Sequence, residues 1–276
     1  MSIYKHVFDD LADKRTDKLP FMQNPIWLVA AVLIYFGLIY LWIPRFMKYR
    51  KPYELRYIMI GYNAFQVIAC TLLVRHFFKH GWSFTYLYTC VPGDYSNNPS
   101  AVGFMYGAYF NFLLKGIELL DTVLFGLRKK QSQISFLHVY HHSCTLICAW
   151  IFTKYFGGSM MTYTIIVNSI VHIFMYSYYL LAIFAQQLPF KLTAVKKFIT
   201  VIQIAQLISI LVNVGFAMRK NCPIPSAMVF IYLPFMVVLL SLFFNFYFTT
   251  YRRPKRELAS DSSATGNQTI DTRKDQ

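Results

Sequence analysis

The sequence is poor in charged residues, and poorest in acidic ones. Charged residues make up 14% of its 276 residues, with 12 Asp and Glu against 27 Lys and Arg. Soluble globular domains carry about 25% charged residues, so this composition excludes an ordinary soluble domain. There are only five cysteines, and no internal repeat is visible in the chain. With so few charged residues, the distribution of the apolar residues is the main indication of the fold class.

Apolar residues supply 56% of the chain, and aromatic residues supply 18%. Crossing a bilayer takes about 20 mostly apolar residues in a helix. Seven blocks approach that length: roughly 26–43, 57–74, 104–126, 136–153, 159–185, 198–218 and 227–250. The sequence therefore predicts an all-α polytopic membrane protein with seven transmembrane helices in residues 26–250. Residues 1–25 form a separate N-terminal segment, and the polar residues 251–276 are expected to be a disordered tail.

The net charge of +15 lies mainly between the apolar blocks. In a soluble protein such a charge would suggest nucleic acid, which is not expected as a partner here. Basic residues gather in alternate loops, at 45–56, 128–130 and 191–197, and again after residue 251. Basic loops favour the cytosolic side of a membrane. These loops and the C-terminus are therefore predicted to be cytosolic, and residues 1–25 are predicted to be lumenal.

The cysteines are compatible with this orientation. Cys70, Cys144 and Cys148 fall in predicted helices, whereas Cys90 and Cys222 fall in two loops on the lumenal side. Thiols pair in oxidising compartments such as the endoplasmic reticulum lumen. A disulfide between Cys90 and Cys222 would tie the loop after the second block to the loop after the sixth. The sequence alone leaves open whether the two thiols meet.

Polar residues interrupt four of the apolar blocks, at spacings that place them on one face of a helix. Such residues are costly in a membrane and are functional candidates for that reason. With the predicted orientation, all four stripes fall in the cytosolic half, which indicates a polar cavity open to the cytosol. The stripes are Lys115, Glu118, Asp121 and Thr122; His138, His141 and His142; Asn168, His172, Tyr176 and Tyr179; and Gln203 and Gln206.

Several of these residues also have a structural interpretation. Lys115 and Glu118 can form an ion pair that neutralises itself, and the two glutamines can bond neighbouring helices. The two tyrosines can be packing aromatics. A purely structural role is least expected for the histidines, because four imidazoles gather in one half of the bundle.

One interpretation of the histidines is a metal site, since His138-x-x-His141-His142 has the spacing of iron and zinc ligands. The pattern occurs in membrane di-iron desaturases and hydroxylases, which use several histidine boxes. This chain has seven histidines in total, and His6, His76 and His80 are predicted to lie outside the helices on the lumenal side. A single zinc held by His138, His142 and a carboxylate remains as an alternative, which would make the protein a metal-dependent lipid oxidase or hydroxylase.

The other interpretation is nucleophilic catalysis. A neutral imidazole can attack a thioester and carry the acyl group, while a neighbouring imidazole moves protons near neutral pH. Cys144, one turn beyond His141, is a rival nucleophile. A non-enzymatic lipid transporter is a further alternative, although stripes confined to one half of the membrane do not form a path across it.

The four stripes, taken in order, resemble the ELO family of very-long-chain fatty acid elongases. Residues 115–122 match KxxExxDT, 138–142 match HxxHH, 168–179 match NxxxHxxMYxYY and 200–206 match TxxQxxQ. The resemblance extends over roughly residues 20–252.

The resemblance implies a seven-helix fold in which helices 2–7 form an inverted barrel around a closed acyl tunnel. It implies a condensing enzyme of the endoplasmic reticulum membrane that joins a long-chain acyl-CoA to malonyl-CoA and releases CO2 and CoA. No metal or other cofactor is implied. The family's lumenal disulfide joins the loops that here contain Cys90 and Cys222. The partners expected are the reductases and dehydratase of the elongation cycle, with a homodimer as a further expectation.

The resemblance also suggests roles for the motif residues. We expect His141 to be the nucleophile, His172 and His138 to assist it, and Asn168 and His142 to polarise carbonyls or orient imidazoles. The remaining residues of the stripes are expected to position substrate: Lys115, Glu118, Asp121, Thr122, Tyr176, Tyr179, Gln203 and Gln206. Basic side chains at the cytosolic mouth are expected to meet the phosphates of CoA: Arg128, Lys129, Lys197 and Arg252.

Overall fold

The computed structural model describes residues 11–187 and 192–252. Within these ranges the chain is helical and contains no strand. The long elements are α2 (Ile26–Phe36), continued by η3 (Gly37–Trp42) and α3 (Ile43–Met47), α4 (Arg56–Lys79), α5 (Pro99–Glu118), α6 (Leu120–Leu127), α7 (Phe136–Tyr155), α8 (Thr162–Ile183), α9 (Thr193–Ala217) and α10 (Ser226–Tyr247), extended by η7 (Phe248–Arg252). Short helical turns are η2 (Lys14–Lys18), η4 (Phe84–Leu87), η5 (Gln131–Gln133) and η6 (Ala185–Gln187). Each of the seven predicted apolar blocks contains helix, so the all-α prediction is confirmed.

Five helical spans of the described chain are long and apolar enough to cross a membrane: Ile26–Met47, Arg56–Lys79, Thr162–Ile183, Thr193–Ala217 and Ser226–Arg252. The protein is therefore a multi-pass membrane protein. The third and fourth blocks, which form α5–α6 and α7, are not among the five. They are the blocks that carry Lys115, Glu118 and Asp121 and the histidine triplet. The number of helices that cross the membrane and the inverted barrel both remain predictions.

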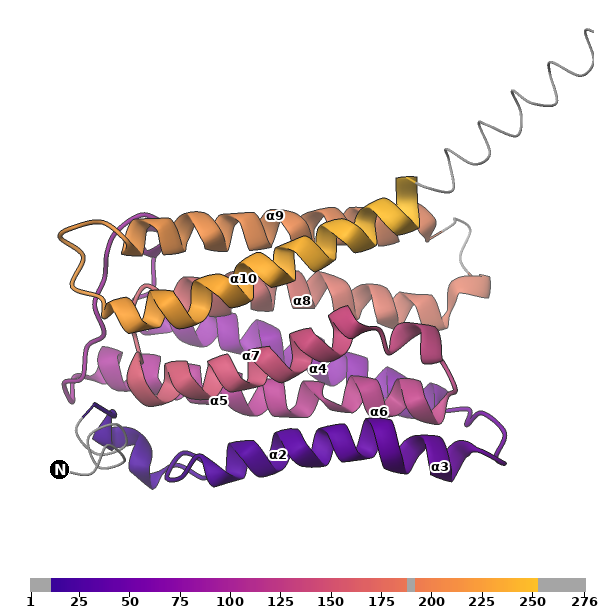
Figure 1. The fold of residues 1–276 in the computed structure, drawn as a ribbon. Coiled ribbons are helices and arrows are strands. Elements are labelled where there is room, and N and C mark those ends of the chain that lie inside the picture. The colour runs from indigo at the N-terminus through magenta and orange to yellow at the C-terminus, as the bar shows by residue number, and fades with distance from the viewer. Residues whose placement is uncertain (1–10, 188–191, 253–276) are drawn as a thin grey trace, which may run out of the picture.

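The helices lie side by side in one bundle (Figure 1). The most extensive contacts join α4 to α8 and α5 to α7, and α9 packs between α8 and α10. The span from α2 to α3 lies along one edge of the bundle, against α6 and α7. Large apolar side chains on its outer face are exposed, among them Trp27 and Leu33. In a bilayer, such side chains face lipid and need no protein partner.

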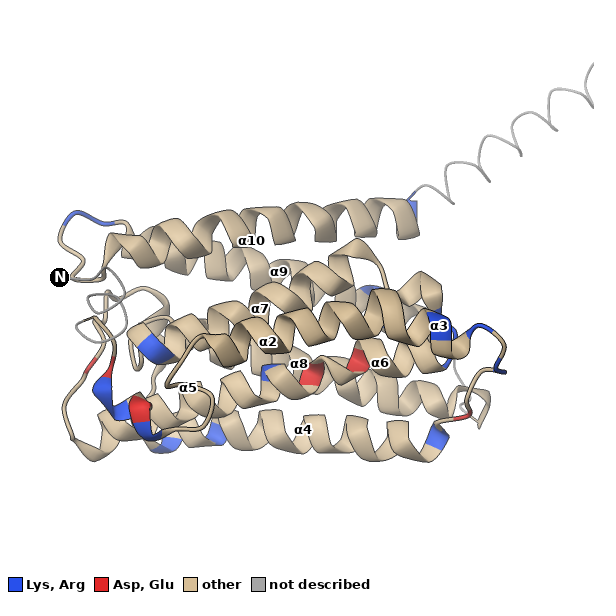
Figure 2. Ribbon diagram, turned by 60° about the horizontal axis from the view of Figure 1, so that its bottom comes forward, with Lys and Arg blue, Asp and Glu red and all other residues tan. Residues whose placement is uncertain are grey.

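The two ends of the bundle differ in their charge. One end, here called the α6–α7 end, carries the turns after α3, α6 and α8 together with Arg252. Most of its charged described residues are Lys and Arg, with Glu54 as an acid among them, whereas Lys and Arg are mixed with Asp at the opposite end (Figure 2). The backbone N–H of Tyr53 donates to the carbonyl oxygen of Leu127 over 3.1 Å, which ties the first of these turns to the end of α6. The loops that were predicted to share one side of the membrane therefore do share one end of the bundle.

The opposite end, here called the disulfide end, is closed by long-range links. Cys90 and Cys222 form a disulfide with Cα atoms 5.6 Å apart, as predicted. Beside it, the amide nitrogen of the buried Asn213 in α9 donates to the carbonyls of Tyr86 (2.9 Å) and Leu87 (2.8 Å) in η4. The loop after α4 is thus held to the end of α9 by both a covalent bond and hydrogen bonds.

Residues 11–25 dock onto the disulfide end. The ammonium of Lys154, at the end of α7, lies 2.5 Å from the carboxylate of Asp17. The indole N–H of Trp150 donates to the carbonyl oxygen of Phe21 over 3.0 Å. Met22 is completely buried against α7 and its neighbours. The segment that was predicted as a separate lumenal region is therefore packed against the bundle over its described part.

Two expectations about element boundaries are wrong. The third block was predicted as one continuous helix over 104–126, but it breaks at Leu119 between α5 and α6. His76 was expected outside the helices, but α4 continues to Lys79 because Arg75–Lys79 still pack against the neighbouring helices through the buried Phe77. His80 follows α4, as expected. His6 and residues 253–276 of the predicted tail lie outside the described residues.

Candidate active site

The acidic and hydroxyl residues of the third block lie on one face, as their spacing predicted. Glu118 ends α5 and is completely buried, while Asp121 and Thr122 lie in the first turn of α6 and are also buried. At Leu119, between them, the N–H donates to the carbonyl of Gly116, three residues back, over 3.3 Å, while the backbone keeps helical dihedral angles. The break therefore tightens the last turn of α5 without turning the chain out of the helix.

The histidine triplet lies in the first turns of α7. The hydroxyl of Ser135, at the helix N-cap, accepts from the N–H of His138 over 3.3 Å, which fixes where the helix begins. The ring centroids of His138 and His142 are 4.3 Å apart, as expected one helical turn apart, and those of His141 and His142 are 5.1 Å apart. His172 comes from α8, with its ring centroid 6.4 Å from that of His141. The sequence prediction that four imidazoles gather is confirmed.

His172 is held by an ion pair from α5. The ammonium of Lys115 donates to both carboxylate oxygens of Glu118 over 2.9 Å and to the side-chain oxygen of Asn168 over 2.8 Å. Oε1 of Glu118 in turn lies 3.2 Å from Nδ1 of His172, a close electrostatic contact that lacks hydrogen-bond geometry. All four residues were predicted site residues. The pair Lys115–Glu118 therefore combines the structural and the functional interpretation, because it neutralises two buried charges and also holds His172 and Asn168 in place.

His142 is faced by the carboxylate of α6. The hydroxyl of Tyr176, which is completely buried, donates to Oδ2 of Asp121 over 2.7 Å. The same oxygen lies 3.9 Å from Nε2 of His142, which is an electrostatic contact longer than a hydrogen bond. Nδ1 of His142 is buried and has no hydrogen-bond partner among the described residues.

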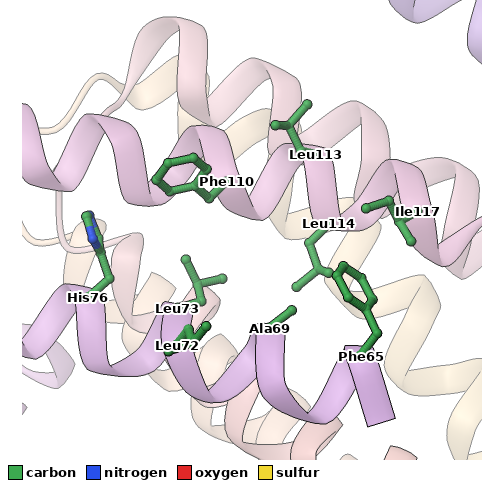
Figure 3. A pocket seen from close by; sticks show the side chains of 9 residues that line it. All are labelled: Phe65, Ala69, Leu72, Leu73, His76, Phe110, Leu113, Leu114 and Ile117. Atoms are coloured by element: carbon green, nitrogen blue, oxygen red, sulfur yellow. The ribbon is translucent and has the colours of Figure 1, made fainter. Parts of the chain in front are cut away.

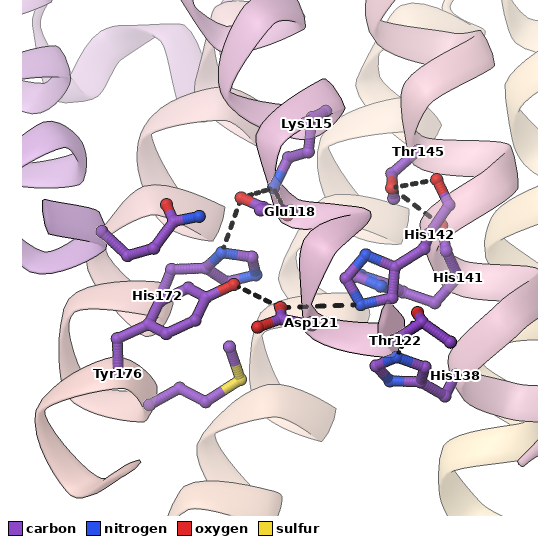
Figure 4. A network of polar contacts seen from close by, with 12 residues as sticks. Lys115, Glu118, Asp121, Thr122, His138, His141, His142, Thr145, His172 and Tyr176 are labelled. Carbon is purple, nitrogen blue, oxygen red and sulfur yellow. Dashed lines mark hydrogen bonds and ion pairs between the residues drawn. The ribbon is translucent and has the colours of Figure 1, made fainter. Parts of the chain in front are cut away.

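His138 is held by two hydroxyl groups in series. The hydroxyl of Thr122 and Nε2 of His138 are 2.9 Å apart (Figure 4). The same hydroxyl lies 2.8 Å from that of Tyr35 in α2. The ring of Phe125, one turn beyond Thr122, packs against His138 with centroids 5.2 Å apart. His138 is thereby fixed in position and in orientation.

His141 differs from the other three histidines. Its backbone carbonyl accepts from the hydroxyl of Thr145 over 2.8 Å, but no described residue makes a hydrogen bond to its ring. The ring is partly buried, between His142 and His172. Carboxylates of α5 and α6 thus face His172 and His142, and a hydroxyl of α6 bonds His138. His141 stands beside His142 and His172, and no described residue bonds either of its ring nitrogens.

The other predicted residues lie around this network and not inside it. The ring of Tyr179 meets that of Tyr176, and its side chain is 36% exposed. In α9, Gln206 is buried, and the amide of Gln203 donates to the sulfur of Met175 over 3.5 Å. Gln203 therefore bonds a neighbouring helix, as in the structural alternative, and does so beside the site.

The four predicted phosphate-binding residues lie at the α6–α7 end and make local contacts there. Arg128 and Lys129 follow α6, and Lys129 has a φ of 55° with its N–H bonded to the carbonyl of Gly126 over 3.0 Å, so its backbone caps the helix. Lys197 lies over the ring of Tyr247, and Arg252 lies over that of Phe248. The structure assigns no ligand to any of the four.

Sequence analysis missed two contributions to the site. Tyr35 comes from the first helix, which was expected to stand outside the barrel. From α4, Asn63 and Gln66 are buried, the amide of Gln66 donates to the hydroxyl of Tyr62 over 3.0 Å, and the ring of Tyr62 meets that of Tyr176. The spacing of Asn63 and Gln66 in an apolar block was a signal of the same kind as the other stripes.

The arrangement does not favour a metal centre. Within residues 11–187 and 192–252, no group of three or more His, Cys, Asp or Glu side chains is arranged to hold a metal ion. The zinc alternative required His138 and His142 with a carboxylate, but Nε2 of His138 is engaged by Thr122 and its neighbour His142 faces Asp121 at 3.9 Å.

An apolar pocket of about 280 Å³ lies apart from this network, between α4 and α5 (Figure 3). Its rim includes the exposed side chains of Phe65, Leu72 and Phe110, and its floor includes the buried Leu73 and Leu114. The other lining residues are Ala69, His76, Leu113 and Ile117. The pocket lies between α4 and α5, and none of the predicted site residues lines it.

Comparison with known proteins identifies the family to which this arrangement belongs. The chain is 34% identical over 257 residues to very long chain fatty acid elongase 4 of Homo sapiens, covering 93% of this chain and 81% of the relative. It is 35% identical over 260 residues to elongase 1 of Homo sapiens (93% and 92% covered) and 34% identical over 259 residues to elongase 7 of Drosophila melanogaster (93% and 78% covered). The family model described as "ELO: GNS1/SUR4 family" matches residues 20–259. The chain is therefore a member of the ELO family.

Proposed function

We propose that this protein is a very-long-chain 3-oxoacyl-CoA synthase, the condensing enzyme of fatty acid elongation. It joins a long-chain acyl-CoA to malonyl-CoA and yields a 3-ketoacyl-CoA, CO2 and free CoA. Membership of the ELO family and the names of its relatives support the reaction class. The single observation that carries the mechanism is the unbonded ring of His141 among three histidines that are each faced by a polar partner.

The first half-reaction transfers the acyl group to His141. A ring nitrogen of His141 attacks the thioester carbonyl, a C–N bond forms, the C–S bond breaks, and CoA leaves with the proton given up by the imidazole. Because His142 and His172 flank His141, they are the groups placed to pass this proton. The buried Nδ1 of His142 has no partner among the described residues. It is proposed to donate a hydrogen bond to the thioester carbonyl oxygen as negative charge develops on that oxygen.

The second half-reaction makes the new carbon–carbon bond. Loss of CO2 from malonyl-CoA gives an enolate, whose carbon attacks the acyl carbonyl on His141. The C–N bond breaks as the C–C bond forms, and the imidazole takes up one proton from solvent, because its own proton left with CoA. No external oxidant, reductant or metal is needed to balance either half-reaction. The absence of a cofactor is accordingly part of the proposal.

The charged and polar side chains around the histidines hold the imidazole rings in place and border the proposed substrate sites. Lys115, Glu118 and Asn168 form one hydrogen-bonded unit beside His172, so they hold its ring. Asp121, Thr122 and Tyr176 do the same for His142 and His138. Tyr179, Gln203 and Gln206 are proposed to border the acyl tunnel. Arg128, Lys129, Lys197 and Arg252 are proposed to meet the phosphates of CoA at the α6–α7 end.

We further propose that the α6–α7 end faces the cytosol and the disulfide end faces the lumen of the endoplasmic reticulum. The charge of the α6–α7 end and the Cys90–Cys222 disulfide at the opposite end support this orientation. The tail from residue 251 is then cytosolic. The product would pass to the reductases and dehydratase of the elongation cycle, and the protein itself is proposed to form a homodimer.

The reaction is tested with purified full-length protein, a long-chain acyl-CoA and malonyl-CoA labelled in its free carboxylate, in the presence of a metal chelator. We expect labelled CO2 to be released in step with a 3-ketoacyl-CoA that is two carbons longer than the substrate. Activity that disappears with the chelator and returns with added metal would overturn the metal-free mechanism. CO2 release without a lengthened product would overturn the condensing function.

A further inference from the structure

The first helix contributes one polar group to the site. The span from α2 to α3 is mostly exposed along its length, and Tyr35 is one of the few α2 side chains that are buried, at 2% exposure. Its hydroxyl lies 2.8 Å from that of Thr122, which is completely buried and lies 2.9 Å from Nε2 of His138. A buried hydroxyl costs free energy unless it is hydrogen-bonded, so this contact has to be made inside the bundle.

Two hydrogen bonds join the three groups of this chain. Either hydroxyl can donate or accept, and the role of Nε2 follows from the tautomer of His138. In either direction Thr122 is bonded to both Tyr35 and His138. Loss of the tyrosine hydroxyl therefore leaves the hydroxyl that holds His138 with one partner fewer.

The consequence for His138 is a fixed orientation. Its Nε2 is bonded to the hydroxyl of Thr122, which holds one edge of the ring. The ring packs between those of Phe125 and His142, with centroids 5.2 and 4.3 Å away. His142 in turn lies against His141, at 5.1 Å. A change in the tilt of His138 is therefore passed to the ring beside the proposed nucleophile.

We propose that Tyr35 is a positioning residue for the condensation, acting through Thr122 to fix the orientation of His138. The proposal rests on the proposed function, since it assigns a role within that same site. It places the first helix in the catalytic unit, although most of that helix faces lipid. Tyr35 touches neither substrate nor the reacting atoms, so its effect appears in the rate of the chemical step and not in substrate binding.

The test measures kcat and KM for acyl-CoA in the full-length enzyme and in four variants: Tyr35→Phe, Thr122→Val, the double variant and Tyr40→Phe. Phenylalanine keeps the ring of Tyr35 and removes only its hydroxyl, and Tyr40, five residues on and 59% exposed, is the matched control. We expect Tyr35→Phe to lower kcat by about fivefold, the rate factor that one hydrogen bond supplies, with KM unchanged. Tyr40→Phe should keep the wild-type values.

The double variant separates the proposed route from general damage to the fold. If Tyr35 acts only through Thr122, the double variant has the kcat of Thr122→Val alone, because the chain is already broken. Effects that multiply, a change confined to KM, or a wild-type kcat in Tyr35→Phe would each overturn the inference. Melting temperatures of all variants are measured alongside, and a fall in kcat that follows a fall in melting temperature would also overturn it. Absence of condensation by the wild-type protein would instead contradict the proposed function.

Discussion

At the scale of single residues, the site is organised by what its acidic and hydroxyl side chains hold. Glu118 lies beside His172, Asp121 faces His142 and Thr122 bonds His138, and these three partners follow one another within five residues of sequence. No described residue makes a hydrogen bond to the ring of His141. One short segment of α5 and α6 therefore orders the histidines of two other helices and distinguishes one of the four.

The buried Lys115–Glu118 pair contributes both to the stability of the protein and to its activity, and substitutions can separate the two. Lys115 is 6% exposed and Glu118 is completely buried, so Glu118→Gln leaves an uncompensated ammonium inside the bundle. We expect a loss of about 3–5 kcal/mol in stability and loss of condensation, measured by thermal unfolding in detergent and by product formation.

The matched control adds Lys115→Met to Glu118→Gln. This double variant should recover stability because no buried charge remains, but it should stay inactive because His172 has lost the carboxylate beside it. Recovery of activity together with stability would mean that the pair is only structural.

The motif residues were predictable from the sequence, because a charged or imidazole side chain in an apolar block has few structural explanations. His138, His141, His142 and His172 meet as predicted, and so do Lys115, Glu118 and Asn168. Tyr35 was not predictable in this way. A single tyrosine in an apolar helix is also typical of a residue near the membrane surface, and its partner Thr122 is distant in sequence.

At the scale of elements, close approach of two helices depends on glycine. α4 and α5 meet near the disulfide end, where a Cβ on Gly103 would stand 2.0 Å from Cδ2 of His80 and a Cβ on Gly107 would stand 2.7 Å from Cζ of Phe77. Nε2 of His76 bonds the carbonyl of Gly103 over 2.8 Å at the same place. Further along, the two helices leave the apolar pocket between them.

Substitution of this glycine should loosen the helix pair. Gly103→Ala forces His80 to move and disturbs its bond to the carbonyl of His76, so we expect a loss of about 1–3 kcal/mol. Gly61→Ala, in α4 with nothing within 4 Å of the added methyl group, is the control. It should be neutral or stabilising, because alanine favours helix more than glycine does. Equal melting temperatures for the two variants would contradict the claim that close approach of α4 and α5 at Gly103 stabilises the protein.

The docked N-terminal segment gives a second prediction at this scale. Lys154 is 1% exposed, and its ammonium is paired with Asp17, which is 44% exposed. Asp17→Asn should therefore destabilise the protein by about 1–3 kcal/mol, less than a fully buried pair because water reaches the carboxylate.

Adding Lys154→Met to Asp17→Asn should restore the melting temperature, since an apolar side chain fits the buried position. Limited proteolysis should cut within residues 11–25 faster in Asp17→Asn than in the wild type. If the cleavage rate is unchanged, the ion pair does not hold the segment.

Element positions were predictable to within a few residues, but element breaks were not. Apolar blocks marked where helices lie because the bilayer demands them. The break at Leu119 is local, and Gly116, three residues earlier, is a weak signal of it. The extension of α4 past residue 74 depends on Phe77 packing beneath residues of α5, a tertiary contact that no single segment contains.

At the scale of the whole molecule, the two ends of the bundle are built differently. The disulfide end is fastened by Cys90–Cys222, by the bonds of Asn213 and by the docked residues 11–25. The α6–α7 end carries basic residues and, in the described part of the chain, is joined between its turns by the contact of Tyr53 with Leu127.

Loss of the disulfide should therefore weaken the fold without changing the chemistry. Cys90 and Cys222 are 132 residues apart, and crosslinks across long loops typically stabilise by about 2–5 kcal/mol. We expect Cys90→Ser to lower the melting temperature and to abolish the difference in electrophoretic mobility between reduced and oxidised protein. Cys148→Ser, at a cysteine that forms no disulfide, should retain that difference. A mobility difference that persists in Cys90→Ser would contradict the pairing.

The central claim is that His141 carries the acyl group, and the most direct measurement traps that intermediate. The purified enzyme is incubated with acyl-CoA in the absence of malonyl-CoA, quenched and digested, and the modified peptide is mapped by mass spectrometry. The account predicts one acyl group on His141, release of one CoA per enzyme, no adduct and no condensation in folded His141→Ala, and an unchanged adduct in Cys144→Ser. An acyl group on Cys144 or another residue, or full activity in His141→Ala, would contradict it.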